Sequence, residues 1–102
     1  MSTEPSRLSF TASEPRTIAL EGVIDAHTAP VLDEKAEELG AAEDVHVDLS
    51  GVDFVDSSGL RALVTWHESL ADAGNRLEMS SPTSAVARLF EIAGIRDHLH
   101  LR

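Results

Sequence analysis

Segments with the two-residue periodicity of β-strands alternate with segments of helical periodicity along almost the whole chain. Strands are predicted at residues 7–12, 17–22, 44–50, 75–80 and 95–102, and helices at 28–40, 58–73 and 81–94. Each helix follows a strand and ends at or next to a glycine, the residue that most often terminates helices. Because strand–helix–strand connections are nearly always right-handed, this β-β-α-β-α-β-α-β order predicts an α/β fold with a mainly parallel sheet.

The hydrophobic pattern also predicts where the helices pack. In the segment 44–50, apolar Val45, Val47 and Leu49 alternate with polar residues. A strand covered on both faces would be apolar throughout, so we expect helices mostly on one face of the sheet. The weaker alternation at 7–12, followed by turn residues, predicts an antiparallel edge strand at the N-terminus.

Length and charge narrow the class of protein. The 102 residues are enough for one domain, which we expect to span 1–102 with a core at about 8–101. Eighteen acidic residues against eight basic ones give a net charge of −10, which argues against nucleic-acid partners and suits solubility or a basic partner. No apolar run is long enough to span a bilayer and the N-terminus lacks a signal-like apolar region, so we expect a cytoplasmic protein without membrane insertion.

Metal chemistry has little support in the sequence. There are no cysteines, and the five histidines do not form the helical pair of a zinc hydrolase. His98 and His100 share one side of the last predicted strand, but no third ligand accompanies them. We therefore expect neither a metal site nor a cofactor.

The stretch "VDFVDSSGL" joins a strand to a helix through Asp56, Ser57, Ser58 and Gly59, and two interpretations compete for it. The first is capping, with Ser57 bonding the free N–H groups of the helix and Asp56 favouring its positive end. The second is a nucleophilic Ser58, but the G-x-S-x-G pattern of hydrolases is absent and no base is recognisable, so we do not expect an enzyme. If Ser57 caps the helix alone, Ser58 stands in the first helical turn with its hydroxyl near the surface. Thr28 and Ser81 are predicted to cap the other two helices.

A resemblance to a known family suggests a further role for the Ser58 hydroxyl. The stretch "VDLSGVDFVDSSGLRALV" resembles the signature of bacterial anti-sigma factor antagonists, small members of the STAS superfamily. "LEGVIDAHTAPVL" resembles their G-x-(I/L)-D-x-x-(T/S)-A segment, and "SPTSAVARLFEIAGI" resembles their S-P-x-V-x-R-L-F-x-x-x-G segment. The match runs from about Thr17 to Leu99 in the family's order and implies a STAS-like fold.

The resemblance implies a phosphorylation switch. Such antagonists bind an anti-sigma factor that is also a serine kinase, and thereby free the sigma factor. The kinase phosphorylates the second serine of the D-S-S-G element, which is Ser58 here, and the phosphoprotein is released until a serine phosphatase resets it. The antagonist is the substrate of this cycle and not an enzyme.

We expect the partner surface at the carboxyl edge of the sheet, where the loops after parallel strands gather. Asp25 and Asp56 should bracket Ser58 there, either contacting a basic partner residue or capping the helices that follow them. The remaining residues predicted for this surface are His27, Thr28, Ser57, Gly59, Leu60 and Arg61.

Two departures from the family pattern bear on the partner. Arg61 stands where many relatives have a small residue, and it either alters the fit of the partner or offers a cation to a phosphate. The sequence ends soon after the last predicted strand, whereas relatives commonly continue into a further helix.

The alternative function is a STAS scaffold of a stress-sensing assembly or an accessory subunit of a lipid-transport ATPase.

Overall fold

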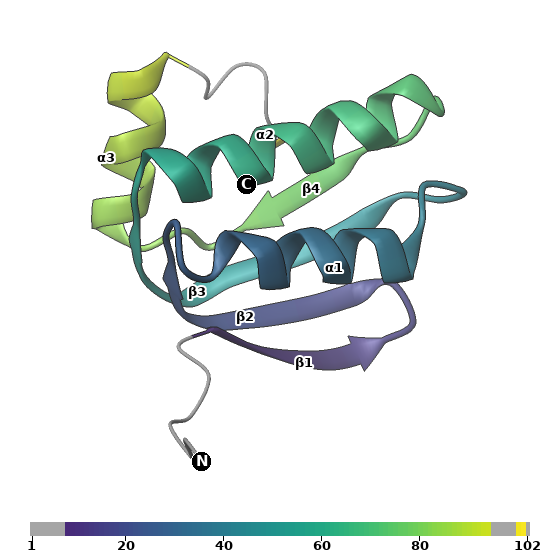
Figure 1. The fold of residues 1–102 in the computed structure, drawn as a ribbon, viewed down its shortest axis with the longest axis horizontal. Helices are drawn as coiled ribbons and strands as arrows, with labels where there is room; N and C mark the ends of the chain where they lie inside the picture. Colours follow the sequence, from purple (N-terminus) through teal and green to yellow (C-terminus); the bar gives the residue numbers. More distant parts are fainter. Residues whose placement is uncertain (1–7, 95–99, 102) are drawn as a thin grey trace.

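The computed structural model describes residues 8–94 and 100–101, and it confirms the predicted order of elements (Figure 1). The strands are β1 (Leu8–Glu14), β2 (Thr17–Ile24), β3 (Val45–Val55), β4 (Leu77–Ser80) and β5 (His100–Leu101). The helices are α1 (Ala29–Leu39), α2 (Ser57–Asp72) and α3 (Ser84–Ala93).

The five strands form one sheet in the order β1-β2-β3-β4-β5. β1 pairs antiparallel with β2, whereas the other neighbouring strands pair in parallel, which confirms the predicted antiparallel edge strand. A helix connects each consecutive pair of parallel strands. The carboxyl ends of β2, β3 and β4 therefore share one edge of the sheet.

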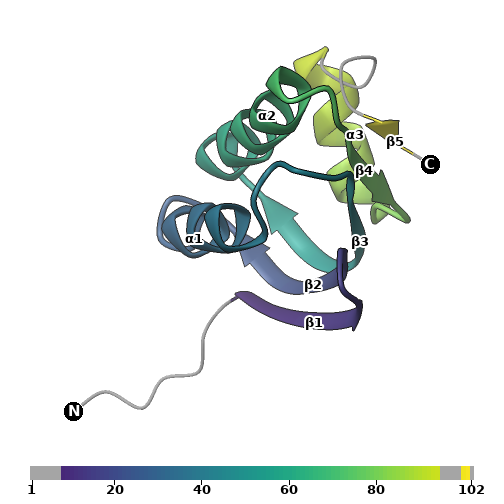
Figure 2. The ribbon, with the colours of Figure 1, turned by 90° about the vertical axis from the view of Figure 1, so that its right-hand side faces the viewer.

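α1 and α2 contact each other and cover one face of the sheet (Figure 2). α3 lies beyond the carboxyl end of β4, at the left of Figure 1, and contacts β3. On the other face of the sheet, His46 of β3 lies with its Nε2 2.9 Å from the Ser80 hydroxyl and its Nδ1 3.7 Å from a Glu78 oxygen. The helices thus lie mostly on one face, as the alternation in β3 predicts.

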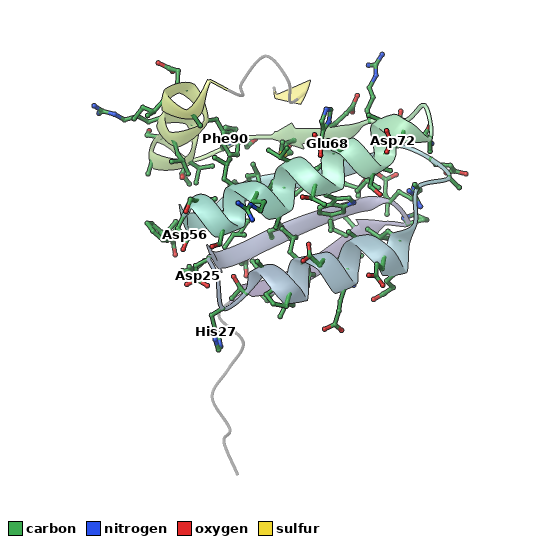
Figure 3. All side chains as sticks on the ribbon, turned by 45° about the horizontal axis from the view of Figure 1, so that its top comes forward. Asp25, His27, Asp56, Glu68, Asp72 and Phe90 are labelled. Atoms are coloured by element: carbon green, nitrogen blue, oxygen red, sulfur yellow. The ribbon has the colours of Figure 1, made fainter. Side chains whose placement is uncertain are left out.

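One apolar core joins the sheet to the helices. Its side chains come from every strand with described side chains and from all three helices, and the helical ones are Leu32, Ala62, Leu63, Trp66, Leu70, Val86 and Phe90. Phe90 of α3, labelled in Figure 3, is completely buried. Burial of these faces, and not helix propensity alone, stabilises helices of this length.

The strands beside the site are longer than predicted. β2 continues to Ile24 and β3 to Val55, well beyond the segments 17–22 and 44–50. Register shifts between Ala19 and Glu21 and between Gly22 and Val23 let the two strands stay paired through their glycines. The prediction ended both strands near a glycine because it assumed an uninterrupted alternation.

The buried faces of α2 and α3 also differ from the prediction. The sequence pattern predicts that Leu60, Leu63, Val64, His67 and Ala71 share a face of α2, with Leu70 beside them. Leu63 and Leu70 are buried, whereas Leu60, Val64 and His67 are half-buried and Ala71 is exposed. The prediction missed buried Gly59, Ala62 and Trp66, so it placed the face too far around the helix. In α3, Val86 and Phe90 are buried as predicted, whereas Leu89 is half-buried and Ala93 is exposed.

The predicted cap of the third helix was wrong. α3 begins after Thr83, whose side chain accepts a hydrogen bond from Val86 N (3.4 Å), and not after Ser81. Ser81 has a φ of 55° and turns the chain at the end of β4 instead.

Of the last predicted strand, residues 95–99 and 102 lie outside the described residues, and β5 contains only His100 and Leu101.

Candidate functional site: the start of α2

The ends of β2 and β3 bring two turns together at the carboxyl edge of the sheet. Ile24 is in register with Val55, and the Asp56 N–H donates a hydrogen bond to the Ile24 carbonyl oxygen at 3.1 Å. Asp25 and Asp56, the residues that follow these strand ends, lie close together in Figure 3, with His27 nearby. The structure therefore brings these two carboxylates to the edge where the sequence predicts them.

Asp56, and not Ser57, caps α2. Its carboxylate accepts a hydrogen bond from Gly59 N at 2.9 Å, and its carbonyl oxygen accepts one from Leu60 N at 2.8 Å. An aspartate at this position satisfies a free N–H group of the helix and favours its positive end. The sequence offered both Ser57 and Asp56 as caps of this helix, and in the structure Asp56 makes the hydrogen bond.

The cap by Asp56 leaves both serine hydroxyls free. Ser57 is exposed and Ser58 is half-buried, as the first two residues of α2. Within the described residues, neither side chain forms a hydrogen bond. The prediction that the Ser58 hydroxyl lies near the surface in the first helical turn agrees with this position.

Gly59 lets the start of α2 lie directly against the end of β2. A Cβ atom at this position would lie 2.2 Å from the Ile24 carbonyl oxygen and 2.7 Å from its Cγ2 atom. Heavy atoms do not approach so closely without displacing the backbone, so only glycine fits here. The glycine thus fixes where Ser57 and Ser58 stand relative to the Asp25 turn.

Asp25 and Thr28 build the neighbouring turn. The Asp25 carboxylate accepts hydrogen bonds from His27 N (2.9 Å) and Thr28 N (3.0 Å). The Thr28 hydroxyl accepts from Asp25 N (2.9 Å) and donates to the Val23 carbonyl oxygen (2.8 Å). Thr28 occupies the predicted N-cap position of α1, but its side chain makes no cap hydrogen bond and is only 2% exposed.

A groove of about 760 Å³ between α1 and α2 opens beside the two serines. Most of its walls are small residues, and Trp66 and Leu70 line it as well. Ser57, Ser58 and Arg61 line it together from the first turns of α2, and Asp33 and Glu37 line it from α1. Sequence reasoning missed the residues of α1, because periodicity shows which face of a helix is polar but not what lies opposite.

Other predicted site residues differ in exposure. His27 and Arg61 are exposed and Leu60 is half-buried, whereas Thr28 and Gly59 are buried. Sequence reasoning also passed over Phe54, which is 52% exposed although it lies just before the end of β3. The sequence did carry a signal: Val52 and Val55 are both apolar but lie three residues apart, so strict alternation cannot bury both. Both are buried in the structure, and Phe54 between them faces outward.

The described part of the chain has neither a cluster of metal ligands nor a membrane-spanning helix. Among the side chains of residues 8–94, no three histidines or acidic residues lie together as a metal site. No helix in the part that the structure describes is both long and apolar enough to cross a membrane.

Comparison with known proteins assigns the class of this fold and site. A family model described as "Mlab, STAS domain" matches residues 9–101. The chain therefore belongs to the STAS-domain family.

Individual relatives narrow the assignment. The chain is 30% identical over 86 residues to the anti-sigma-B factor antagonist of Staphylococcus epidermidis, covering 82% of this chain and 80% of that protein. It is 29% identical, with the same coverage, to the protein of that name from Staphylococcus aureus. These relatives place it among the anti-sigma factor antagonists of the family, as the sequence resemblance implies.

Solved structures agree on the fold. The unphosphorylated form of the anti-sigma factor antagonist SpoIIAA, from Bacillus, superposes with a TM-score of 0.73 at 18% identity, covering 93% of this chain and 87% of that one. An anti-sigma factor antagonist from Mycobacterium paratuberculosis gives 0.76 at 24% identity, covering 92% and 82%.

Proposed function

We propose that this anti-sigma factor antagonist is switched by phosphorylation of Ser58. Unphosphorylated, it binds an anti-sigma factor that is also a serine kinase; phosphorylated on Ser58, it is released, and a serine phosphatase restores it. Because the unphosphorylated form binds the anti-sigma factor and frees the sigma factor, it is the form that permits sigma-factor-dependent transcription. The observation that carries this proposal is the cap by Asp56, which leaves the Ser58 hydroxyl half-exposed and without a hydrogen bond within the described residues.

The position of Ser58 supports a modification that leaves the fold intact. A phosphate at the second residue of α2 meets free N–H groups and the positive end of the helix dipole, typically a gain of about 0.3–1 kcal/mol. SpoIIAA has been solved in a phosphorylated form too, and this chain superposes on it with a TM-score of 0.67 at 17% identity. We therefore expect the switch to act on the complex and not on folding.

Release from the partner needs a larger energy than the helix end supplies. Phosphorylation adds about 1.5–2 negative charges at pH 7. Reversing a two-state population from 1:99 to 99:1 takes about 5.5 kcal/mol. Burying that charge against a partner without a matching cation costs several kcal/mol per ion, so desolvation in the interface is the term of sufficient size.

The surrounding residues are given two kinds of role in this proposal. His27, Ser57, Leu60 and Arg61 are at least partly exposed and are proposed to contact the partner. The other four residues are proposed to keep this surface in its shape. The polar groups of Asp25, Asp56 and Thr28 form hydrogen bonds within the fold, and Gly59 lets α2 approach β2 because it has no Cβ.

The test is capture of partners from the host lysate with and without ATP, followed by mapping of phosphorylated residues. Wild-type protein should retain a kinase without ATP and lose it with ATP, and Ser58→Ala should retain it in both conditions. Ser57→Ala is the matched control, since it removes the neighbouring hydroxyl and should still be released. Phosphorylation of the Ser58→Ala variant at the wild-type rate would contradict the proposal.

The same capture distinguishes the accessory role. An accessory subunit would co-purify with an ATPase or a large assembly whether or not ATP is added, and Ser58 would stay unmodified.

A further inference from the structure

Arg61 stands one helical turn after Ser58 on the same side of α2. Residues three apart in a helix are surface neighbours, with Cβ atoms about 5–6 Å apart. Ser57, Ser58 and Arg61 also line the same groove, so Arg61 and Ser58 face a shared space. An arginine side chain spans this separation easily, and an anion that precedes a cation along a helix is the favourable order.

Arg61 is available for a new partner. It is exposed, and within the described residues it makes no hydrogen bond or ion pair. Two other basic residues, Arg16 and Lys35, are already engaged: the Arg16 guanidinium donates to the carbonyl oxygens of four residues, and Lys35 lies 3.4 Å from Glu38.

Among the described residues that line the groove, Arg61 carries the positive charge that could pair with a phosphate. Arg61 is the one basic residue among the described side chains that line it, and Asp33 and Glu37 line it from α1. Asp25 and Asp56 lie at the nearby edge of the sheet. A phosphate on Ser58 therefore enters an acidic neighbourhood, and the guanidinium that lines the same groove belongs to Arg61.

We infer that Arg61 is the internal counter-ion of phosphorylated Ser58, an inference that rests on the proposed modification of that serine. The planar guanidinium donates two parallel N–H groups to two phosphate oxygens, a geometry that a lysine ammonium does not reproduce. Once paired, Arg61 is withdrawn from the surface offered to the kinase partner. Phosphorylation then changes that surface twice, by adding a dianion and by removing the free cation beside it.

The experiment uses the full chain with phosphoserine incorporated at position 58 during translation, so no kinase is needed. The second pKa of the phosphate, about 6 in the absence of a partner, is measured by ³¹P NMR titration. Arg61→Gln should raise this pKa by about 0.15–0.4, a change of roughly 1.4-fold to 2.5-fold in the proton-binding constant, because the dianion loses its counter-ion. Arg61→Lys should give an intermediate value, and 1 M salt should reduce the difference.

Arg76→Gln is the matched control. It removes the same charge from an exposed arginine just before β4, at the opposite edge of the sheet from Ser58, and should leave the phosphate pKa unchanged. An equal phosphate pKa in Arg61→Gln and wild type, or an equal shift in Arg76→Gln, overturns the inference. Neither result bears on whether a kinase modifies Ser58, which the capture experiment decides separately.

Discussion

Replacing Gly59 by alanine tests how closely α2 approaches β2. The added Cβ would lie 2.2 Å from the Ile24 carbonyl oxygen, so the helix start must move by about 0.8 Å to reach even the 3.0 Å that real Cβ contacts essentially never undercut. The obstacle is mainly backbone, which cannot rotate away as a flexible side chain would. The same carbonyl oxygen accepts the hydrogen bond from Asp56 N, and the movement would strain that bond.

The expected loss is about 1–3 kcal/mol. Overpacking a well-fitted site costs about 1–3 kcal/mol, and a weakened hydrogen bond adds about 1 kcal/mol. Alanine is favoured over glycine inside a helix by about 0.5–1 kcal/mol, which offsets part of that cost. The steric term is larger, so the substitution should destabilise the protein although it raises helix propensity.

Urea unfolding followed by circular dichroism measures this loss. With a slope of about 1–3 kcal/mol per molar, the unfolding midpoint should fall by roughly 1 M, and the slope itself should not change. Gly74→Ala is the control: its φ of 82° disfavours alanine, but no atom lies within 4 Å, so only the left-handed backbone cost of about 1–2 kcal/mol applies. An unchanged or raised stability of Gly59→Ala would refute the close approach.

Three further substitutions test the supports of the site by the same unfolding assay. Asp56→Ala should cost about 0.5–2 kcal/mol because it removes the cap of α2, whereas Asp56→Asn should retain most of the stability. Thr28→Val should cost about 1–3 kcal/mol, since it keeps the shape but leaves buried polar groups of the Asp25 turn without the hydroxyl; a fully stable Thr28→Val would contradict that role. Arg16→Ala should cost about 1–2 kcal/mol and increase amide exchange in the last turn of α1, where its guanidinium bonds the Leu39 and Gly40 carbonyl oxygens at 2.7 and 3.0 Å. Arg16→Lys should recover less than half, and full recovery would show that charge alone suffices.

Much of the fold could be predicted because local and global signals agree. The alternation of strands and helices, the helix-ending glycines and the polar side of β3 each depend on residues close together in sequence. The handedness of strand–helix–strand units then leaves few possible topologies. The position of Asp25 and Asp56 at one edge follows from the same rule.

The details that sequence reasoning missed depend on contacts between distant segments. Ser81 and Thr83 are both residue types that cap helices, so the local sequence does not choose between them. The third helix begins after Thr83, whose hydroxyl also donates to the Val52 carbonyl oxygen at 3.2 Å, a contact with a distant segment. The buried face of α2 is set by Gly59 against Ile24, a contact across 35 positions of the sequence. Periodicity cannot report such pairs, and a glycine carries no hydrophobic signal.

The assignment of the cap explains why two serines and a carboxylate occur together at this turn. If a serine hydroxyl capped α2, its phosphorylation would remove a cap worth about 0.5–2 kcal/mol and would loosen the helix that carries the proposed partner surface. Asp56 makes the same bond with a group that phosphorylation does not touch. In the proposed switch, the helix start therefore keeps one geometry in both states while the charge on Ser58 changes. The proposed switch would act through the electrostatics of docking, and its strength would depend on the nearest cation, which is why Arg61 is the residue of this surface whose replacement is most informative.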